Sequence, residues 1–297
     1  MKTGARPGGR PPAAVEISPE GVLAAALPAA GQAPVYAFEP LAAGALAPGV
    51  AEPNLHAPEA VAAAMRSTLG QAGARSRSVT VVLPDLAVRV FVLDFDSLPA
   101  KASEAVPVLR FRLRKMVSFD VEHSGVGYQV LSQSKTETKV LVAILPGPIL
   151  AEYENAVRSA GYEPGAVLPS SLAGLEGLDS MEAVLSVNLS REALTTSIAN
   201  GNDLLLYRTL ELPEDAGLRL AEIQRGIAVA AAYFEDKLGA RPRALYYAGR
   251  EDSRSFAGWI EDHGLEVVDA GRPDTGAATS LGGASVAGVA GALAGVR

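Results

Sequence analysis

The amino-acid sequence contains no cysteine, and this absence excludes disulfide scaffolds, cysteine-ligated metal sites and thiol chemistry. It also lacks an excess of positive charge, because 26 lysines and arginines stand against 33 aspartates and glutamates, a formal net charge of −7. We therefore expect no nucleic-acid binding, which needs a positive field. Hydrophobic residues make up 48% and charged residues 20% of the 297 residues, a composition that excludes a disordered chain and indicates a folded protein of about two domains.

Motifs that mark common catalytic and metal sites are also missing. The sequence has no GxxxxGK[ST] phosphate loop, no HExxH and no GxSxG. Its three histidines have no second ligand at metal-binding spacing, so we expect surface or interface residues and no metal site. Asp94 and Asp96 fall on one face of a predicted strand, as a carboxylate pair or a Mg²⁺ site would, and a solvated strand edge is the alternative.

The two ends of the chain differ in composition. Residues 1–12 combine glycine, proline and three basic residues without an apolar run, so they lack a secretory signal and predict a disordered tail. Residues 275–296 carry no charge and are long enough to cross a bilayer, but they are mostly alanine, glycine, serine and threonine. Because glycine costs about 1 kcal/mol in a helix and adds no apolar surface, we expect a small-residue helix packed inside a soluble protein, with a tail anchor as the alternative.

Three blocks of secondary structure follow one another along the chain. Residues 13–77 predict a strand hairpin with a Ser-Pro-Glu-Gly turn, a further strand, and a helix opened by Pro58. Residues 78–165 predict a compact α+β block with strands on each side of a charged helix. Residues 166–297 predict a strand meander, a long helix over 216–238 and a closing α/β segment.

The charged helix of the second block is expected over residues 104–116. It carries the basic run Arg110, Arg112, Arg114 and Lys115 next to two large apolar residues, Phe111 and Met116. Such a run is able to bind phosphate, an acidic partner or anionic headgroups, and a solvated helix face is the alternative.

The order of the blocks resembles the type IV pilus assembly proteins called PilM, relatives of the cell-division protein FtsA and of the cytoplasmic part of the secretion protein GspL. Over residues 98–131 a proline, a charged helix, the segment VSF at 117–119 and the strand sequence YQVL follow in the family's order. ETKVLVAILP, PILAEYENAVRSAGYEP and VLPSSLAGLEGL are similar to the family's next segments. The resemblance covers residues 13–297.

The resemblance implies an α/β (α+β) architecture: a two-lobed actin-like (ribonuclease H-like) fold with an inserted small α+β subdomain. By this alignment of blocks, residues 13–77 form the first lobe and 78–165 the inserted subdomain. Residues 166–297 form the second lobe, and their C-terminal helix returns to the core.

The resemblance also identifies the places where a nucleotide would bind. Actin-like ATPases hold it between the lobes, and each lobe offers an Asp-x-Gly hairpin whose Gly admits backbone N–H groups and whose Asp organises Mg²⁺. In the first lobe Glu16 stands for the Asp and Ser18 for the Gly, with Gly21 in the same hairpin. Pro19 removes one N–H donor, and Glu20 adds negative charge where phosphates would lie.

The second-lobe elements depart from the family's pattern as well. Asn188 stands where the family has Asp and lacks the charge that binds the metal, and Ser190 stands for the Gly. The glycine-rich turn on the adenosine side keeps only Gly249. With all three elements degenerate, we expect a pseudo-ATPase with no catalytic residue and no cofactor; binding of ATP and Mg²⁺ without turnover is the alternative.

For function, the resemblance implies a cytoplasmic scaffold at the inner face of the inner membrane, in the assembly platform of a type IV pilus or type II secretion machine. PilM proteins bind the cytoplasmic N-terminal tail of a membrane protein, PilN, in a groove between the first lobe and the insert. The alternatives are a working actin-like ATPase or small-molecule kinase, and an FtsA-like protein with another partner. A homo-oligomer stays open. The candidate groove residues are Val88, Val90, Phe111 and Met116.

Overall fold

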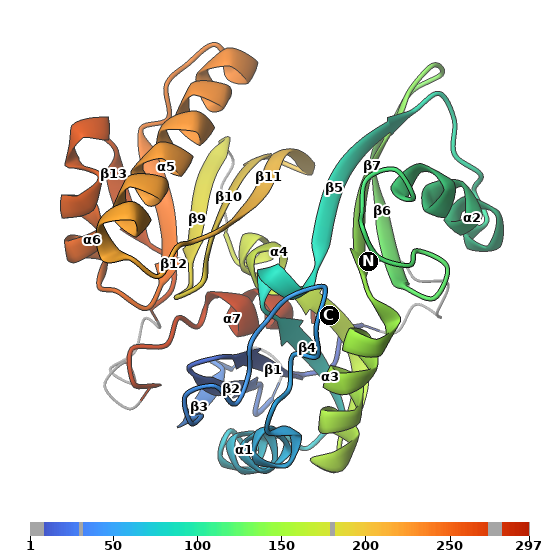
Figure 1. Ribbon diagram of the computed structural model, residues 1–297, viewed down its shortest axis with the longest axis vertical. Helices are drawn as coiled ribbons and strands as arrows, with labels where there is room; N and C mark the ends of the chain where they lie inside the picture. The colour runs from blue at the N-terminus through green and yellow to red at the C-terminus, as the bar shows by residue number, and fades with distance from the viewer. Residues whose placement is uncertain (1–8, 30–31, 179–181, 273–280, 297) are drawn as a thin grey trace.

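The computed structural model describes residues 9–29, 32–178, 182–272 and 281–296. Within these ranges the chain forms two lobes, each built on a five-stranded sheet, and a smaller subdomain built on a three-stranded sheet (Figure 1). In the view of Figure 1 the first lobe lies at the bottom, the second at the upper left and the subdomain at the upper right.

The first lobe is a mixed sheet with strand order β3-β2-β1-β4-β8 and helices on both faces. Alternate residues of its strands point to opposite sides: Val15 and Ile17 pack with α1 and α3, whereas Ala14 and Leu23 pack with α7. Two apolar cores therefore sandwich this sheet. Its elements are β1 (Ala13–Ser18), β2 (Gly21–Ala26), β3 (Val35–Pro40), α1 (Pro58–Gln71), β4 (Ser78–Leu83), α3 (Gly147–Ser159), β8 (Glu163–Pro169) and the C-terminal α7 (Ala287–Ala294).

The subdomain is narrower than the expected insert of residues 78–165. It consists of the sheet β5-β7-β6 and the helix α2, whereas β4, α3 and β8 belong to the first lobe. The physical reason lies in β4, which is buried from its second residue onward and pairs in parallel with β1 on one side and β8 on the other. The subdomain elements are β5 (Arg89–Phe95), α2 (Ala102–Leu113), β6 (Gly125–Gln133) and β7 (Thr138–Leu145).

The second lobe has the strand order β11-β10-β9-β12-β13, with α5 and α6 packed against it. Asp215 caps α5 by accepting a hydrogen bond from the N–H of Leu218 at 2.9 Å, and Gly239 ends the helix in the left-handed conformation with φ 68°. The elements are β9 (Val184–Leu189), β10 (Ala193–Asn200), β11 (Asp203–Glu211), α5 (Ala216–Leu238), β12 (Ala244–Gly249), α6 (Ser253–Trp259) and β13 (Glu266–Asp269).

Two small-residue helices, α4 (Ser170–Glu176) and α7, lie between the lobes (Figure 1). A Cβ added to Gly291 of α7 would lie 2.7 Å from the carbonyl carbon of Ala173, and one added to Gly177 would lie 3.3 Å from the Cα of Gly291. The two helices therefore touch backbone to backbone. This contact explains the alanine and glycine content near the C-terminus, where the sequence predicts a tightly packed helix.

The terminal segments are described in part. Residues 1–8 of the expected disordered tail lie outside the described residues, and Arg10 forms an ion pair with Glu176 at the end of α4. Residues 275–280 of the uncharged C-terminal stretch also lie outside the described residues. None of the helices in the described ranges has both the length and the hydropathy needed to cross a membrane.

Candidate functional site

The cleft between the two lobes brings together most of the residues that the sequence assigns to a nucleotide site. One cavity of about 560 Å³, including space open to solvent, is lined by both hairpins and by the end of β12. A neighbouring cavity shares several of its residues and reaches Pro19 and Asp85. The predicted residues that line the two cavities are Glu16, Ser18, Pro19, Asn188, Ser190 and Gly249.

Gly21 has a structural explanation that does not involve the cleft. A Cβ at this position would collide with the carbonyl oxygen of Glu39 and would lie 2.6 Å from the ring of Phe38. Both residues belong to β3, which pairs with β2 at this point. Glycine is therefore required by the close approach of two strands.

Glu16, which the resemblance predicts in place of a metal-binding aspartate, lines both cavities of the cleft. Its Oε1 accepts a hydrogen bond from the hydroxyl of Ser170 at 2.6 Å, while its Oε2 is buried and has no hydrogen-bond partner. Burial raises the pKa of Glu16 to about 7; the hydrogen bond from Ser170 opposes this rise, and the charges of Asp85 and Glu20 add to it. Near pH 7 a Mg²⁺ ion would have to displace the proton from about half of these carboxyl groups.

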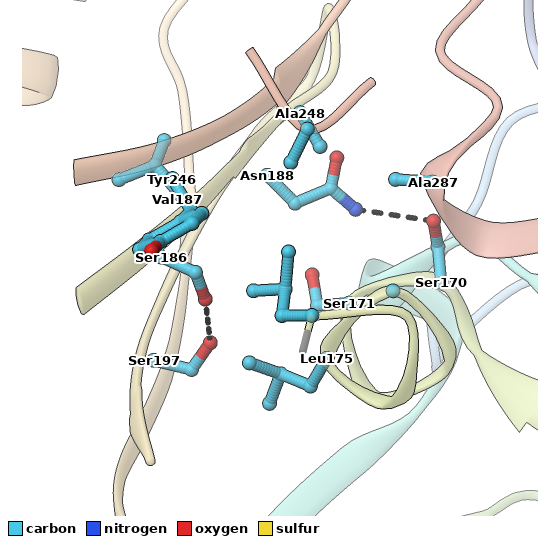
Figure 2. A pocket seen from close by; sticks show the side chains of 13 residues that line it. Ser170, Ser171, Leu175, Ser186, Val187, Asn188, Ser197, Tyr246, Ala248 and Ala287 are labelled. Atoms are coloured by element: carbon cyan, nitrogen blue, oxygen red, sulfur yellow. Dashed lines mark hydrogen bonds between the residues drawn. The ribbon is translucent and has the colours of Figure 1, made fainter. Parts of the chain in front are cut away.

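Asn188 links the second lobe to the same carboxyl group. Its amide donates to the hydroxyl of Ser170 at 3.1 Å, and Figure 2 shows the amide directed at Ser170 of α4 with Ala287 of α7 beside it. Behind this contact, the hydroxyls of Ser186 and Ser197 are 2.7 Å apart on neighbouring strands of the second lobe (Figure 2). The amide of Asn188 therefore holds α4 against β9.

Asp85 is the best-connected polar side chain of the cleft among the described residues, and it is not one of the predicted site residues. Its Oδ1 accepts the backbone N–H of Ser171 and the hydroxyl of Tyr207, both at 3.0 Å, and its Oδ2 accepts the hydroxyl of Thr195 at 2.9 Å. The hydroxyl of Ser171 also donates to Oδ2, and the amide of Asn188 lies 3.4 Å from it. Burial and the proximity of Asp85 raise the pKa of Tyr207.

These donors occupy the lone pairs of Asp85, since a carboxylate offers about four acceptor positions. Asp85 belongs to the first lobe, in a short 3₁₀ turn after β4, whereas Thr195 and Tyr207 belong to β10 and β11. The cluster therefore ties the lobes together. The one signal in the sequence is a carboxylate directly after a buried parallel strand, where ligand-binding residues gather in open α/β sheets.

The remaining charges of the cleft do not suit Mg-ATP. Glu20 and Glu192 lie near Glu16, and burial followed by the charge of Glu20 raises the pKa of Glu192, whose Oε2 is buried without a partner. Pro19 has no N–H to offer a phosphate. Within the described ranges no group of three or more His, Asp or Glu side chains is placed to hold a metal ion.

The mouth of the cleft carries both signs of charge, with three arginines and two glutamates. A cavity of about 700 Å³, open to solvent, adjoins the hairpin turns. The guanidinium group of Arg219 donates to the carbonyl of Ser190 at 3.0 Å. The cavity is lined by Glu20, Leu189, Ser190, Arg191, Arg219, Arg250, Glu251 and Trp259.

The four residues predicted to line a partner groove are not brought together. Val88 is 4% exposed and lies in the core of the first lobe, and Val90 packs against that core from β5. Phe111 and Met116 lie at α2 and just after it, and both are exposed. Phe111 and Met116 are separated from Val90 because α2 covers the other face of the three-stranded sheet, where its Leu109 packs with apolar residues of the strands.

The titration of Glu16 predicts a pH-dependent stability. Between pH 4.5 and 7 the unfolded chain releases the proton of Glu16 while the folded chain keeps it, so the free energy of unfolding falls as the pH rises. From pH 5.5 to 8 this group alone lowers it by about 2 kcal/mol. We expect Glu16→Gln, whose amide does not ionise, to remove that part of the pH dependence in urea unfolding. Glu214→Gln, at an exposed position, is the control, and equal pH dependence of both variants would contradict the buried ionisation.

Neither a protein-family model nor a curated protein sequence matches the chain. Solved structures do. A chain of the PilM–PilN type IV pilus biogenesis complex is 19% identical, with a TM-score of 0.76 over 96% of this chain and 98% of that one. The cytoplasmic domain of EpsL, an inner-membrane component of the type II secretion system of Vibrio cholerae, is 15% identical, with a TM-score of 0.50 over 80% and 81% of the two chains.

A third similar structure is a Bacteroides thetaiotaomicron protein with an actin-like ATPase fold and unknown function, 11% identical, with a TM-score of 0.52 over 86% of this chain and 88% of that one. At such identities the likeness shows the fold and nothing finer. The predicted fold class is confirmed: the chain has the two-lobed actin-like ATPase fold, with a PilM-like arrangement of its elements.

Proposed function

We propose that the chain is a scaffold of the assembly platform of a type IV pilus or type II secretion machine, at the cytoplasmic face of the inner membrane. In this role it binds the cytoplasmic tail of a PilN-like membrane protein and does not hydrolyse ATP. The likeness to a chain of the PilM–PilN complex over nearly the whole of both chains supports the first part. The likeness to the cytoplasmic domain of a secretion component supports the location.

The observation that carries the absence of hydrolysis is the state of the two metal-binding positions. Burial favours the neutral form of Glu16, and the amide of Asn188 is engaged with Ser170. Hydrolysis of a phosphoanhydride depends almost entirely on positioning and on cations that neutralise the transferring phosphoryl group. A cleft with a carboxyl whose ionisation is suppressed by burial and an amide in those places supplies these functions poorly.

The tail binds, in this proposal, on the face of the three-stranded sheet that α2 leaves uncovered. Val92 and Leu141 are register partners on that face, and Val90 pairs with Ala143 next to the first lobe. Val90, Val92 and Leu141 are each half-buried. An extended peptide there would meet apolar side chains at alternate positions, and such contacts give specificity when a peptide binds along a sheet.

Calorimetric titration of the full chain tests both parts. We expect a synthetic peptide of the co-encoded membrane partner's tail to bind in the micromolar range, about −8 kcal/mol, and Mg-ATP to give no saturable heat. Val92→Asp should weaken the peptide by at least about tenfold, because it places a charge in an apolar contact. Phe111→Asp, on the far side of α2, should leave the peptide affinity unchanged. Turnover of ATP, or equal peptide binding by Val92→Asp, would refute the corresponding part.

A second candidate function, nucleotide binding without turnover, is favoured by the mouth of the cleft. Three arginines and the ring of Trp259 line the cavity there, and none of the three arginines is ion-paired with a described residue. Guanidinium groups bind phosphate without a metal ion. Saturable binding of ATP that persists in EDTA and is lost in Arg219→Gln would establish this function and leave the scaffold role intact.

A further inference from the structure

The outer face of α2 carries large apolar side chains that no part of the described chain covers. Phe111 is 67% exposed, and Val108 and Met116 are 37% and 40% exposed within the same short stretch. The opposite face of the helix is already used, because Leu109 and Leu113 are fully buried against the three-stranded sheet. Figure 1 places α2 at the outer edge of the subdomain, on the side away from the second lobe.

Two cations without ion pairs share this outer face. Val108, Phe111 and Arg112 follow the i, i+3, i+4 spacing of one helical stripe, and Lys115 lies in the turn that continues from the end of α2. Arg112 and Lys115 are exposed and form no ion pair with any described residue.

The other two basic residues of the run have structural roles that hold the helix in place. Arg110 donates to the carbonyls of Glu122 and Ser124 at 2.9 and 2.8 Å, and Arg114 pairs with Glu122 at 2.7 Å. The segment after α2 is thus fixed to the helix, and the outer face keeps its orientation without contributions from Arg112 or Lys115.

We propose that this outer face of α2 rests on an anionic lipid bilayer. Phe111, with Val108 and Met116 beside it, enters the boundary between headgroups and acyl chains, and Arg112 and Lys115 bind lipid phosphates. An aromatic side chain between cations on a helix lying in the plane of the interface is the arrangement that peripheral membrane helices use. The face is the outside of a helix rather than a groove, so it suits a planar surface better than a peptide.

The overall charge of the protein makes this contact directional. The chain carries a formal net charge of −7, so an anionic membrane repels most of its surface. The stretch from residue 105 to residue 119 contains four basic residues and no acidic one. This stretch is attracted to an anionic surface, and the contact therefore orients the protein on the membrane. The inference goes beyond the proposed scaffold role, because it needs no protein partner.

Co-sedimentation of the full chain with vesicles, in the absence of any partner, tests it. We expect binding to vesicles of phosphatidylglycerol and phosphatidylethanolamine, no binding to phosphatidylcholine, and loss of binding as salt is raised. Arg112→Gln/Lys115→Gln should weaken binding about thirtyfold, since each cation contributes about fivefold near an anionic surface. Phe111→Ser should weaken it roughly tenfold through lost apolar contact.

Matched controls distinguish vesicle binding by the outer face of α2 from a general dependence of binding on net charge or exposed apolar surface. Arg75→Gln/Arg254→Gln removes two exposed cations elsewhere, and Leu218→Ser removes a side chain that is 62% exposed on α5. Both should bind vesicles as the parent chain does. No sedimentation with phosphatidylglycerol at low salt, or equal loss in test and control variants, would overturn the proposal. So would intact vesicle binding by Phe111→Ser together with lost binding of the partner's peptide, which would assign the face to a protein.

Discussion

Replacing Asp85 by alanine is expected to lower the free energy of unfolding by about 4 kcal/mol. The substitution removes the acceptor of one backbone N–H and three hydroxyl groups, which lie between the lobes and are buried or half-buried. The hydroxyl of Thr195 is able to turn to Thr209, 3.0 Å away, but the N–H of Ser171 has no other acceptor among the described residues. Urea unfolding followed by circular dichroism measures the loss.

Two further variants make this prediction specific. Asp85→Asn keeps the shape and one acceptor oxygen but loses the charge, so about half of the loss is expected. Asp94→Ala removes an exposed aspartate from the neighbouring strand β5 and should change stability by no more than about 0.5 kcal/mol. If Asp85→Ala were no more destabilising than Asp94→Ala, the hydrogen bonds of Asp85 would not contribute measurably to the free energy of unfolding.

Gly291→Ala is expected to destabilise the protein by about 3 kcal/mol, although alanine is the better helix former. The new methyl group would overlap the carbonyl oxygen of Ala173 and approach its carbonyl carbon to 2.7 Å. Both atoms belong to the backbone of α4, so no side-chain rotation relieves the overlap and the two helices must separate. Thermal and urea unfolding of the purified variant measure the cost.

The matched control is Gly258→Ala in α6. A Cβ at that position meets no atom within 4 Å, so the change should be neutral or slightly stabilising. Equal behaviour of the two variants would mean that α4 and α7 tolerate a wider separation than their contact implies.

Local patterns predicted the elements whose boundaries are set by a few neighbouring residues. The first hairpin follows from its Ser-Pro-Glu-Gly turn, and α5 ends where Gly239 offers the left-handed conformation. By contrast, β8 carries two prolines and a glycine, which argue against a strand. It forms because one hydrogen-bonding edge of β4 is not paired with β1, and β8 pairs with that edge in parallel.

The extent of the subdomain and the role of Asp85 both depend on contacts between distant segments. The donors to Asp85 lie between 86 and 122 positions further along the chain. No local sequence pattern predicts contacts over such separations. Six of the seven residues that the resemblance assigns to a nucleotide site line the cleft, all except Gly21, and a nucleotide site there stays a prediction. Their chemistry required the structure, since the burial of Glu16 and the engagement of Asn188 arise from packing against α4 and α7.

The interlobe cluster also has a mechanical consequence. Opening the cleft would require the hydrogen bonds of Asp85 to break together, while α4 and α7, touching backbone to backbone, leave little room to slide. Load applied to the subdomain is therefore transmitted to the second lobe with little change in the angle between them. Two partners, one bound to the subdomain and the other to the second lobe, would be held at a constant spacing.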